Sequence, residues 1–365
     1  MHLEGYFTDA PVVLSLASSY GTAAQPLRFT SWSSTSMATI AHPTSNGFRI
    51  YSHGVAPLGL GIQIDHLIFR GGNRVPTNGV ATSGIFVDYQ PKSPAMVDTL
   101  IINDVDISGY MYGIFVYRAT PAGFIRNVVI RNSAIHGNVE GTTSDGRGGY
   151  SYINRSGSGI FLSGVQYALI ESVIAFDNGG SSQQSPVGIG IRDSDAVIIR
   201  NSTSQSVTGS IGGFELSAGT TNSLIEMCHS DQNGGFGYSI VSQLDANLNN
   251  GGSSSNITIQ DSTSVGDGTS SSNHPLHSLG VMGLGGAVSS NVHFQNMNVT
   301  TSADDPPFSH YGNQSTQTGF VGLYLSGSYN RIITNMVDFL FPSAISYSCN
   351  LSCASASSPS VCACA

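Results

Sequence analysis

Two short apolar phrases alternate along this chain. The first begins with glycine and places apolar residues at every second position, as in GIFVD from Gly84, GIFLS from Gly159 and GLYLS from Gly322. The second follows it and closes near a polar residue, as in NVVIRNSAI and ALIESVIAF. Alternation with a period of two is typical of β-strands with one buried face. The pattern predicts an all-β chain built from repeated strand–bend–strand units.

The spacing of the copies predicts a solenoid. Gly188, Gly213 and Gly237 begin successive copies 25 and 24 residues apart, close to one coil of a parallel β-helix. When the second phrases are aligned, one column at the bend is mostly Asn, Asp or Ser: Asp104, Asn132, Ser172, Asn201, Met227, Asp261, Asn296 and Asn335. Such residues tolerate left-handed backbone angles and can hydrogen-bond from coil to coil. We expect about ten coils over residues 1–341, followed by a Ser/Ala/Cys-rich tail or linker at 342–365.

Strand alternation separates an inward from an outward set. The predicted inward side chains are Ile114, Val116, Ile160, Leu162, Ile189, Ile191, Phe214 and Leu216, with a second column of Val105, Ser133, Val173, Ser202, Cys228, Ser262 and Met297. Cys228 is then a small buried hydrophobe rather than a reactive thiol. Phe86, Phe115 and Phe161 point outward on successive coils. Exposed rings in a row indicate either a platform for sugar rings or coverage by the long loop from His136 to Ser158.

Composition excludes two classes of partner. The net charge is −9, Lys92 is the single lysine, and the arginines form no basic stripe, so nucleic acid is not expected. No apolar run approaches the roughly 20 residues needed to span a bilayer, and no membrane is expected. The stretch MHLEGYFTDA lacks the features of a signal peptide, so we expect a trimmed N-terminus.

The N-terminal stretches GTAAQPLRFTSW and IQIDHLIFRGG, followed by Asn-cornered coils, carry a family resemblance. They resemble the pectin-lyase-like right-handed β-helix superfamily, especially the first coils of the chondroitinase B and alginate lyase type. The resemblance covers nearly residues 10–341 and implies a right-handed, single-stranded parallel β-helix that acts on or binds polysaccharide, outside the cell or at its surface. The superfamily includes lyases, hydrolases, esterases, epimerases, tailspikes and non-catalytic adhesins, so the scaffold leaves the reaction open. Neither the paired-aspartate pattern of polygalacturonases nor the DPH motif of mannuronan epimerases is present.

A lyase on uronate-containing polysaccharide is the first functional hypothesis. Such an enzyme neutralises the substrate carboxylate, takes the C5 proton and protonates the leaving oxygen, tasks that suit Arg and Tyr. Tyr117, Arg118 and Arg192 are the predicted catalytic residues, with Tyr117 and Arg192 about 10 Å apart across one intervening coil. The predicted substrate-binding residues are Phe86, Phe115, Phe161, Glu215, Arg147 and Tyr150. An ion pair between Arg192 and Glu215 is the alternative for those two side chains.

The remaining acids and loops leave further alternatives. No cofactor is required, but calcium can replace cationic side chains in such lyases, and Asp88 and Asp193 are its candidate ligands. Loop residues that can overhang the face are His136, Glu140, Asp145, His274, His277, Asp304, Asp305 and His310. The competing functions are a non-catalytic glycan-binding or adhesive module, and a glycoside hydrolase if Asp88, Asp193 and Glu215 converge. Monomer and trimer both stay open.

The tail is a region of its own composition. Its four cysteines permit two disulfides in three pairings, or a metal site: Cys349, Cys353, Cys362 and Cys364. The linker-like SASSPS favours disulfides and a secreted protein.

Overall fold

The computed structural model describes most of the chain between residues 1 and 348. The described residues are 1–8, 12–15, 24–54, 60–73, 82–91, 97–118, 125–139, 156–180, 186–209, 211–243, 252–268, 278–284, 287, 289–300, 308–312, 318–321, 324–326, 332–334 and 347–348. Within these ranges every regular element is a β-strand, as the alternating pattern predicts.

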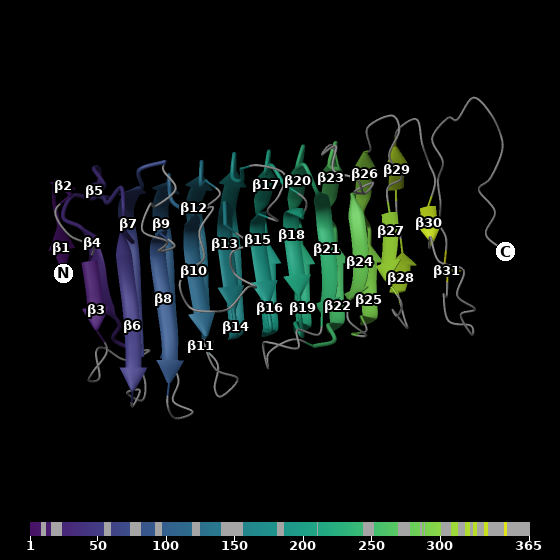
Figure 1. Cartoon of the computed structure of the whole chain (residues 1–365), viewed down its shortest axis with the longest axis horizontal. Helices are drawn as coiled ribbons and strands as arrows, with labels where there is room; N and C mark the ends of the chain where they lie inside the picture. The colour runs from purple at the N-terminus through teal and green to yellow at the C-terminus, as the bar shows by residue number, and fades with distance from the viewer. Residues whose placement is uncertain are drawn as a thin grey trace.

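One sheet has eleven strands, and each pairs in parallel with the equivalent strand of the next coil. These strands are β3 (Val12–Ser15), β6 (Phe48–Gly54), β8 (Ser83–Pro91), β10 (Tyr112–Arg118), β13 (Ser158–Ser163), β15 (Val187–Arg192), β18 (Gly212–Ser217), β21 (Phe236–Gln243), β24 (Leu279–Leu284), β27 (Phe308–Gly312) and β30 (Ile332–Thr334). The seven strands from β8 to β24 in this list carry the Gly-led phrases of the sequence, each with the phrase glycine as its second residue. The phrase GLYLS from Gly322 was expected here too, but that expectation is wrong, because Tyr324–Ser326 (β29) belongs to the other sheet. Figure 1 shows the strands of the eleven-stranded sheet side by side along the long axis, from β3 near one end to β30 near the other.

The second sheet has twenty strands and bends at corners within each coil. Its strands are β1 (His2–Leu3), β2 (Tyr6–Phe7), β4 (Leu27–Ser31), β5 (Ala38–Ala41), β7 (Leu60–Arg70), β9 (Val97–Ser108), β11 (Ile125–Arg126), β12 (Val128–His136), β14 (Val165–Phe176), β16 (Asp195–Arg200), β17 (Thr203–Gln205), β19 (Thr221–Glu226), β20 (His229–Asp231), β22 (Ser255–Gln260), β23 (Thr263–Val265), β25 (Ser290–Gln295), β26 (Asn298–Thr300), β28 (Thr318–Val321), β29 (Tyr324–Ser326) and β31 (Tyr347–Ser348). All its pairings are parallel as well. The predicted right-handed parallel β-helix is confirmed, whereas the count of about ten coils stays a prediction.

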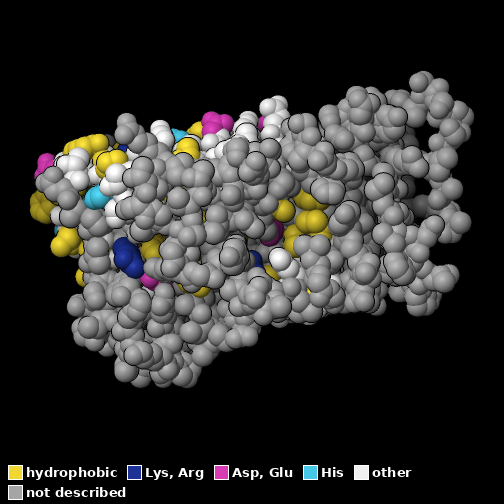
Figure 2. All heavy atoms as spheres, in the orientation of Figure 1, with side chains coloured by type: hydrophobic (Ala, Val, Ile, Leu, Met, Phe, Trp, Pro, Cys, Tyr) yellow, Lys and Arg dark blue, Asp and Glu magenta, His cyan; other side chains and the backbone are white. Residues whose placement is uncertain are grey.

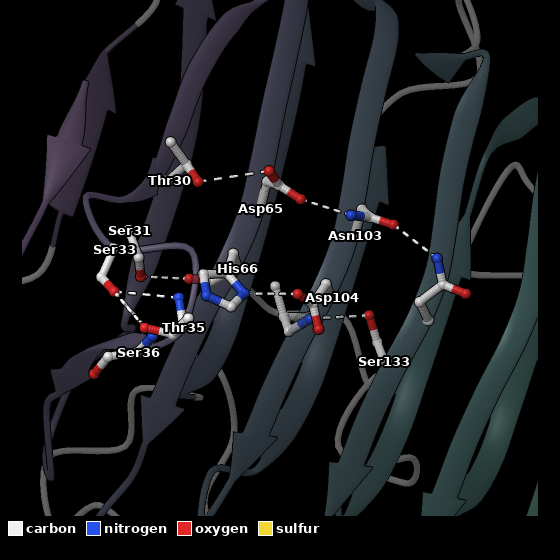
Figure 3. A network of polar contacts seen from close by, with 12 residues as sticks. Thr30, Ser31, Ser33, Thr35, Ser36, Asp65, His66, Asn103, Asp104 and Ser133 are labelled. Carbon is white, nitrogen blue, oxygen red and sulfur yellow. Dashed lines mark hydrogen bonds and ion pairs between the residues drawn. The ribbon is translucent and has the colours of Figure 1, made fainter.

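The polar bend column lies where the sequence places it. Asp104, Asn132, Ser172, Asn201, Met227, Asp261 and Asn296 all have φ between 48° and 54°. Asn335 lies outside the described residues. His66, with φ 54°, extends the column by one coil, and its Nδ1 lies 2.7 Å from Oδ2 of Asp104 (Figure 3). The sequence analysis missed this corner, because the residue type alone does not distinguish a histidine at a bend from a histidine within a strand.

A second corner escapes the sequence analysis. Asn127, Tyr167, Ala196, Asn222, Asn256 and Asn291 also have left-handed backbones. Three of them form a coil-to-coil ladder, in which Asn256 donates to Asn222 at 3.0 Å and Asn291 donates to Asn256 at 2.7 Å. The varied residue types earlier in this column hid its repeat.

The inward columns form one continuous apolar core. Every residue of the two predicted inward sets is at most 5% exposed. Serines of the second column accept buried backbone N–H groups, as Ser202 does from Val173 and Ser262 from Cys228. Cys228 is a free, buried thiol whose pKa burial raises to about 12. The prediction that it is a structural hydrophobe is confirmed.

A third inner column is polar and entirely buried. Asn138 and Asn178 lie near the ends of neighbouring coils, and so do Asn233 and Asp267, with Val207 on the coil between the two pairs. Each of the four polar residues is less than 2% exposed. Asn178 Oδ1 accepts from the backbone N–H and Nδ2 of Asn138, and Asp267 Oδ1 accepts from the same two donors of Asn233. These side chains therefore satisfy the backbone where the chain leaves the second sheet for the first.

Candidate functional site

The outer face of the eleven-stranded sheet carries two columns of side chains in register. One column contains Phe86, Phe115, Phe161, Gly190, Glu215, Ser239 and Gly280. The neighbouring column contains Asp88 opposite Tyr117, and Ser163 opposite Arg192. Tyr117 follows Val116, which pairs with Leu162, so it falls opposite Ser163. The alternation predicted from the sequence thus places Tyr117, Ser163 and Arg192 on one line across three coils.

The three outward phenylalanines are not exposed. Phe86, Phe115 and Phe161 are 7%, 4% and 0% exposed and belong to a second hydrophobic cluster with Met111, Tyr112 and Val187. Of the two alternatives that the sequence leaves open, coverage describes these rings. The loop invoked for that coverage lies mostly outside the described residues, and a role of the three rings in sugar binding stays a prediction.

The cluster is ordered by ring stacking. The rings of Phe86 and Phe115 stack with centroids 5.3 Å apart, and Tyr117 stacks on the same Phe115 ring at 5.8 Å. Phe161 leans over Gly190, where an added Cβ would lie 2.9 Å from its ring. A side chain at position 190 would displace that ring, so this glycine allows the cluster to close over the next coil.

An ion pair borders the aromatic cluster on the N-terminal side. Nη2 of Arg49 lies 3.1 Å from Oδ2 of Asp88, whose side chain is fully buried. The guanidinium also lies 5.6 Å from the centroid of the Phe86 ring, within the range of a cation–π contact. The sequence analysis missed Arg49, because the pairing of β6 with β8 was needed to align Arg49 with Phe86.

Two further charged residues lie on this face nearer its middle. Arg192 is 3% exposed and Glu215 is 0% exposed, while Tyr117 is only partly buried. Gly190 pairs with Glu215 and Arg192 with Ser217, so Arg192 and Glu215 are diagonal neighbours on β15 and β18. Diagonal neighbours have Cα atoms about 8 Å apart, which long side chains can bridge. Arginine and glutamate are rarely buried to this extent unless they are paired.

Asp88 does not converge with the other predicted carboxylates. Asp88 is on β8 and Asp193 follows β15, three strand spacings apart, which is about 14 Å and too far for shared calcium ligands at about 2.5 Å. Glu215 lies one strand further, so Asp88 and Glu215 cannot form a hydrolase pair either. Among the described residues no group of three or more His, Cys, Asp or Glu can hold a metal ion. A joint Asp88–Asp193 calcium site is therefore wrong.

The other predicted residues are placed only in part. Arg118 ends β10 and His310 lies in β27, with the backbone alone described for both. The remaining loop candidates lie outside the described residues: Glu140, Asp145, Arg147, Tyr150, His274, His277, Asp304 and Asp305.

His136 does not overhang this face. It ends β12 in the other sheet, with Nε2 3.0 Å from Oδ1 of Asp106 and its ring stacked on Phe176. Arg70 binds the same carboxylate with two contacts of 2.7 Å. Burial raises the pKa of Asp106, but the hydrogen bond and charge of Arg70, with His136, outweigh it and hold the pKa below its ordinary value. The prediction of an overhanging His136 is wrong, because β12 continues one residue beyond the phrase NVVIRNSAI and so includes His136.

Most of the face shown in the space-filling view (Figure 2) belongs to residues that the structure does not describe, drawn in grey. Near the middle, hydrophobic, acidic and basic atoms are visible between the grey ones (Figure 2). Among the residues the structure describes, no helix is long and apolar enough to cross a membrane.

Comparisons with known proteins find structural similarity only. No protein-family model matches the chain, and no curated protein matches it. The A-module of a mannuronan C-5 epimerase from Azotobacter vinelandii is 11% identical, with 89% of this chain and 80% of that chain covered and a TM-score of 0.43. An alginate lyase from Paenibacillus sp. is 14% identical, with 85% and 89% covered and a TM-score of 0.41. The catalytic domain of an α-1,3-glucanase in complex with nigerose is 12% identical, with 88% and 60% covered and a TM-score of 0.39.

Similarity at this level assigns neither reaction nor substrate. The fold rests instead on the strand pairing of this chain, which makes it a parallel β-helix protein.

Proposed function

We propose that this chain is an extracellular or cell-surface carbohydrate-active protein, and that it cleaves an acidic, uronate-containing polysaccharide as a lyase. The observation that carries the proposal is the line of Tyr117, Ser163 and Arg192 across three coils, with Glu215 diagonal to Arg192. Two strand spacings separate Tyr117 from Arg192, about 10 Å, which accommodates one or two sugar units.

Each side chain has a distinct task in this proposal. The Arg192 guanidinium pairs with the substrate carboxylate and stabilises the charge that develops when the C5 proton leaves. Tyr117, the most accessible of the three, transfers the proton: the C5–H bond breaks, the C4–C5 double bond forms, and the C4–O bond breaks as its oxygen is protonated. Arg118 follows on the same strand and is the second proton-transfer candidate. Glu215 orients sugar hydroxyls.

The test is ultraviolet absorbance of unsaturated uronate ends, with alginate, pectate and chondroitin offered in turn, with and without calcium. We expect a rise with one of them that Tyr117→Phe and Arg192→Gln abolish. Tyr167→Phe is the matched control, since Tyr167 is 55% exposed on the other sheet. Circular dichroism confirms that the variants fold. Full activity in Tyr117→Phe would refute the assigned site.

A non-catalytic glycan-binding module is the second candidate, because the burial of Arg192 and Glu215 argues against their direct contact with a reacting substrate. It predicts no absorbance change with any polyuronide, together with retained binding on a glycan array. The same purified protein serves for both measurements.

A further inference from the structure

The outer face of the twenty-stranded sheet carries an unusual apolar stripe. Along β7, β9, β12, β14, β16, β19, β22 and β25, one outward position in register holds Gln63, Ile101, Val129, Leu169, Ile198, Leu224, Thr258 and His293. Five successive members, from Ile101 to Leu224, are aliphatic, none is fully buried, and Ile198 is 38% exposed. We call the surface formed by these eight strands the ladder face. A contiguous apolar patch of this kind is typical of an interaction surface.

A charged column flanks the stripe two residues further along each strand. Its members are Asp65, Asn103, Arg131, Glu171, Arg200, Glu226, Gln260 and Gln295. Neighbours hydrogen-bond within the chain: Arg200 Nε lies 2.7 Å from Glu171 Oε1, and Asn103 donates to Asp65 at 2.6 Å (Figure 3). The four central members alternate in sign from coil to coil.

This alternation makes the ladder face complementary to itself. A twofold axis parallel to the strands, midway between β14 and β16, reverses the order of the coils in a facing copy. Arg131 then lies opposite Glu226 of the second copy, and Glu171 opposite Arg200. The same operation sets Leu169 against Ile198 of the second copy.

The flanking coils agree with the same axis. It sets Val129 against Leu224 in the stripe, and in the charged column Asn103 against Gln260 and Asp65 against Gln295. In the charged column no charged residue faces a like charge of the second copy. Each position of the apolar stripe faces another position of the same stripe in the second copy. Like charges placed opposite would have opposed such a pairing.

The face is large enough for a stable contact. Eight strands about 4.8 Å apart and about six residues long give roughly 34 Å by 20 Å, or about 700 Å² for each copy. The total of about 1,400 Å² exceeds the roughly 1,000 Å² expected of a biological interface.

We propose that the ladder face binds a second copy of this chain in a twofold, face-to-face dimer. The eleven-stranded sheet stays outside this contact, so the dimer is independent of the proposed lyase activity. A twofold contact of this kind also excludes a trimer built through the same surface.

The decisive experiment gives the central part of the charged column a single sign, so that two copies of the same variant repel each other. One variant, Glu171→Arg with Glu226→Arg, carries only positive charges in the central column; the other, Arg131→Glu with Arg200→Glu, carries only negative ones. Sedimentation at up to about 100 µM, above the micromolar weak end for such interfaces, should show a wild-type dimer, two monomeric variants, and a heterodimer when they are mixed. A monomeric or trimeric wild type, or a mixture that stays monomeric, overturns the proposal.

The apolar stripe is tested by a matched pair. Ile198→Lys should raise the dissociation constant by at least about 100-fold, because in a twofold dimer the substitution is present in both copies and acts at two places in the interface. Ile174→Lys changes an isoleucine that is 50% exposed on the neighbouring strand, β14, but beyond the corner at Ser172, where β14 pairs with β17. This variant should leave the dimer intact. Equal dissociation in both variants, or none in Ile198→Lys, contradicts the assigned face. Circular dichroism checks that both variants are folded.

Discussion

The two outer faces of this β-helix obey the same alternation and have opposite surroundings. On β13, β15 and β18 of the eleven-stranded sheet every residue is buried, including the outward Phe161, Arg192 and Glu215. On β14 and β16 of the twenty-stranded sheet the outward residues stay accessible, and their charges pair along the coil stack. Alternation therefore decides which way a side chain points, whereas the rest of the chain decides whether it meets water.

The difference changes the cost of a charge. On the open face an arginine and a glutamate pair beside solvent, where such pairs contribute little to stability. On the covered face the fully buried carboxylate of Asp88 depends on Arg49. Charges kept away from water are costly unless they are paired, so removing a partner should cost more on the covered face than on the open face.

The comparison is tested most strongly by truncating outward apolar residues. Phe115→Ala on the covered face should lower the free energy of unfolding by about 3–5 kcal/mol, because the ring is 4% exposed and stacks on three neighbours. Ile174→Ala on the open face should cost under about 1 kcal/mol, since that side chain is 50% exposed. Urea unfolding followed by circular dichroism measures both. Equal costs would mean that the two faces do not differ.

The second test compares an ion pair on the covered face with one on the open face. Arg49→Ala should cost about 2–3 kcal/mol, below the full cost of breaking a buried pair, because Asp88 is buried while the Arg49 side chain is 31% exposed. Arg200→Ala, which removes the partner of Glu171 on the open face, should cost under about 1 kcal/mol.

The ionic comparison has its own control. Asp88→Asn removes the buried charge, so Arg49→Ala in that background should cost less than in the wild type. An unchanged cost would assign the effect of Arg49 to its packing on Phe86 rather than to the ion pair.

The third test uses a charge inside the core. Burial raises the pKa of Asp267 to about 6, against an ordinary value of 3.8. The folded protein therefore holds a proton that the unfolded chain loses, and the stability from that proton is full below about pH 4 and lost as the pH rises to 6. Asp267→Asn, which matches Asn138, Asn178 and Asn233 in the same column, should raise stability at pH 7 by about 1–3 kcal/mol.

The pH dependence of the stability gained by Asp267→Asn provides the control. Near about pH 3, below both pKa values, the carboxyl is mostly protonated in both states, so wild type and Asp267→Asn should unfold at nearly the same urea concentration. A gain of equal size near about pH 3 and at about pH 7 would show that hydrogen bonding to Asn233 and Ser264, and not ionisation, separates the two proteins.

The sequence predicts the parts of this molecule that repeat with the coil. The bend column from Asp104 to Asn296 and the inward columns follow from local alternation and backbone preference, and both are confirmed. The cover over Phe115 and the partnership of Arg49 with Asp88 depend on segments distant along the chain, which no local pattern encodes. For the candidate site, alternation aligns Tyr117 with Arg192 but does not reveal that Arg192 is buried.

The smallest predicted effect concerns a corner on the open face. Met227 has φ 51° and is 51% exposed, between Asn201 and Asp261 of the adjacent coils in the bend column. A left-handed backbone costs ordinary residues about 1–2 kcal/mol, and asparagine less, so Met227→Asn should stabilise the protein by about 0.5–1 kcal/mol. Met227→Ala removes the exposed side chain but keeps the backbone cost, so it should give no gain. An equal gain from alanine would trace the effect to the exposed methionine and not to the corner, and would weaken the rule by which this column was found.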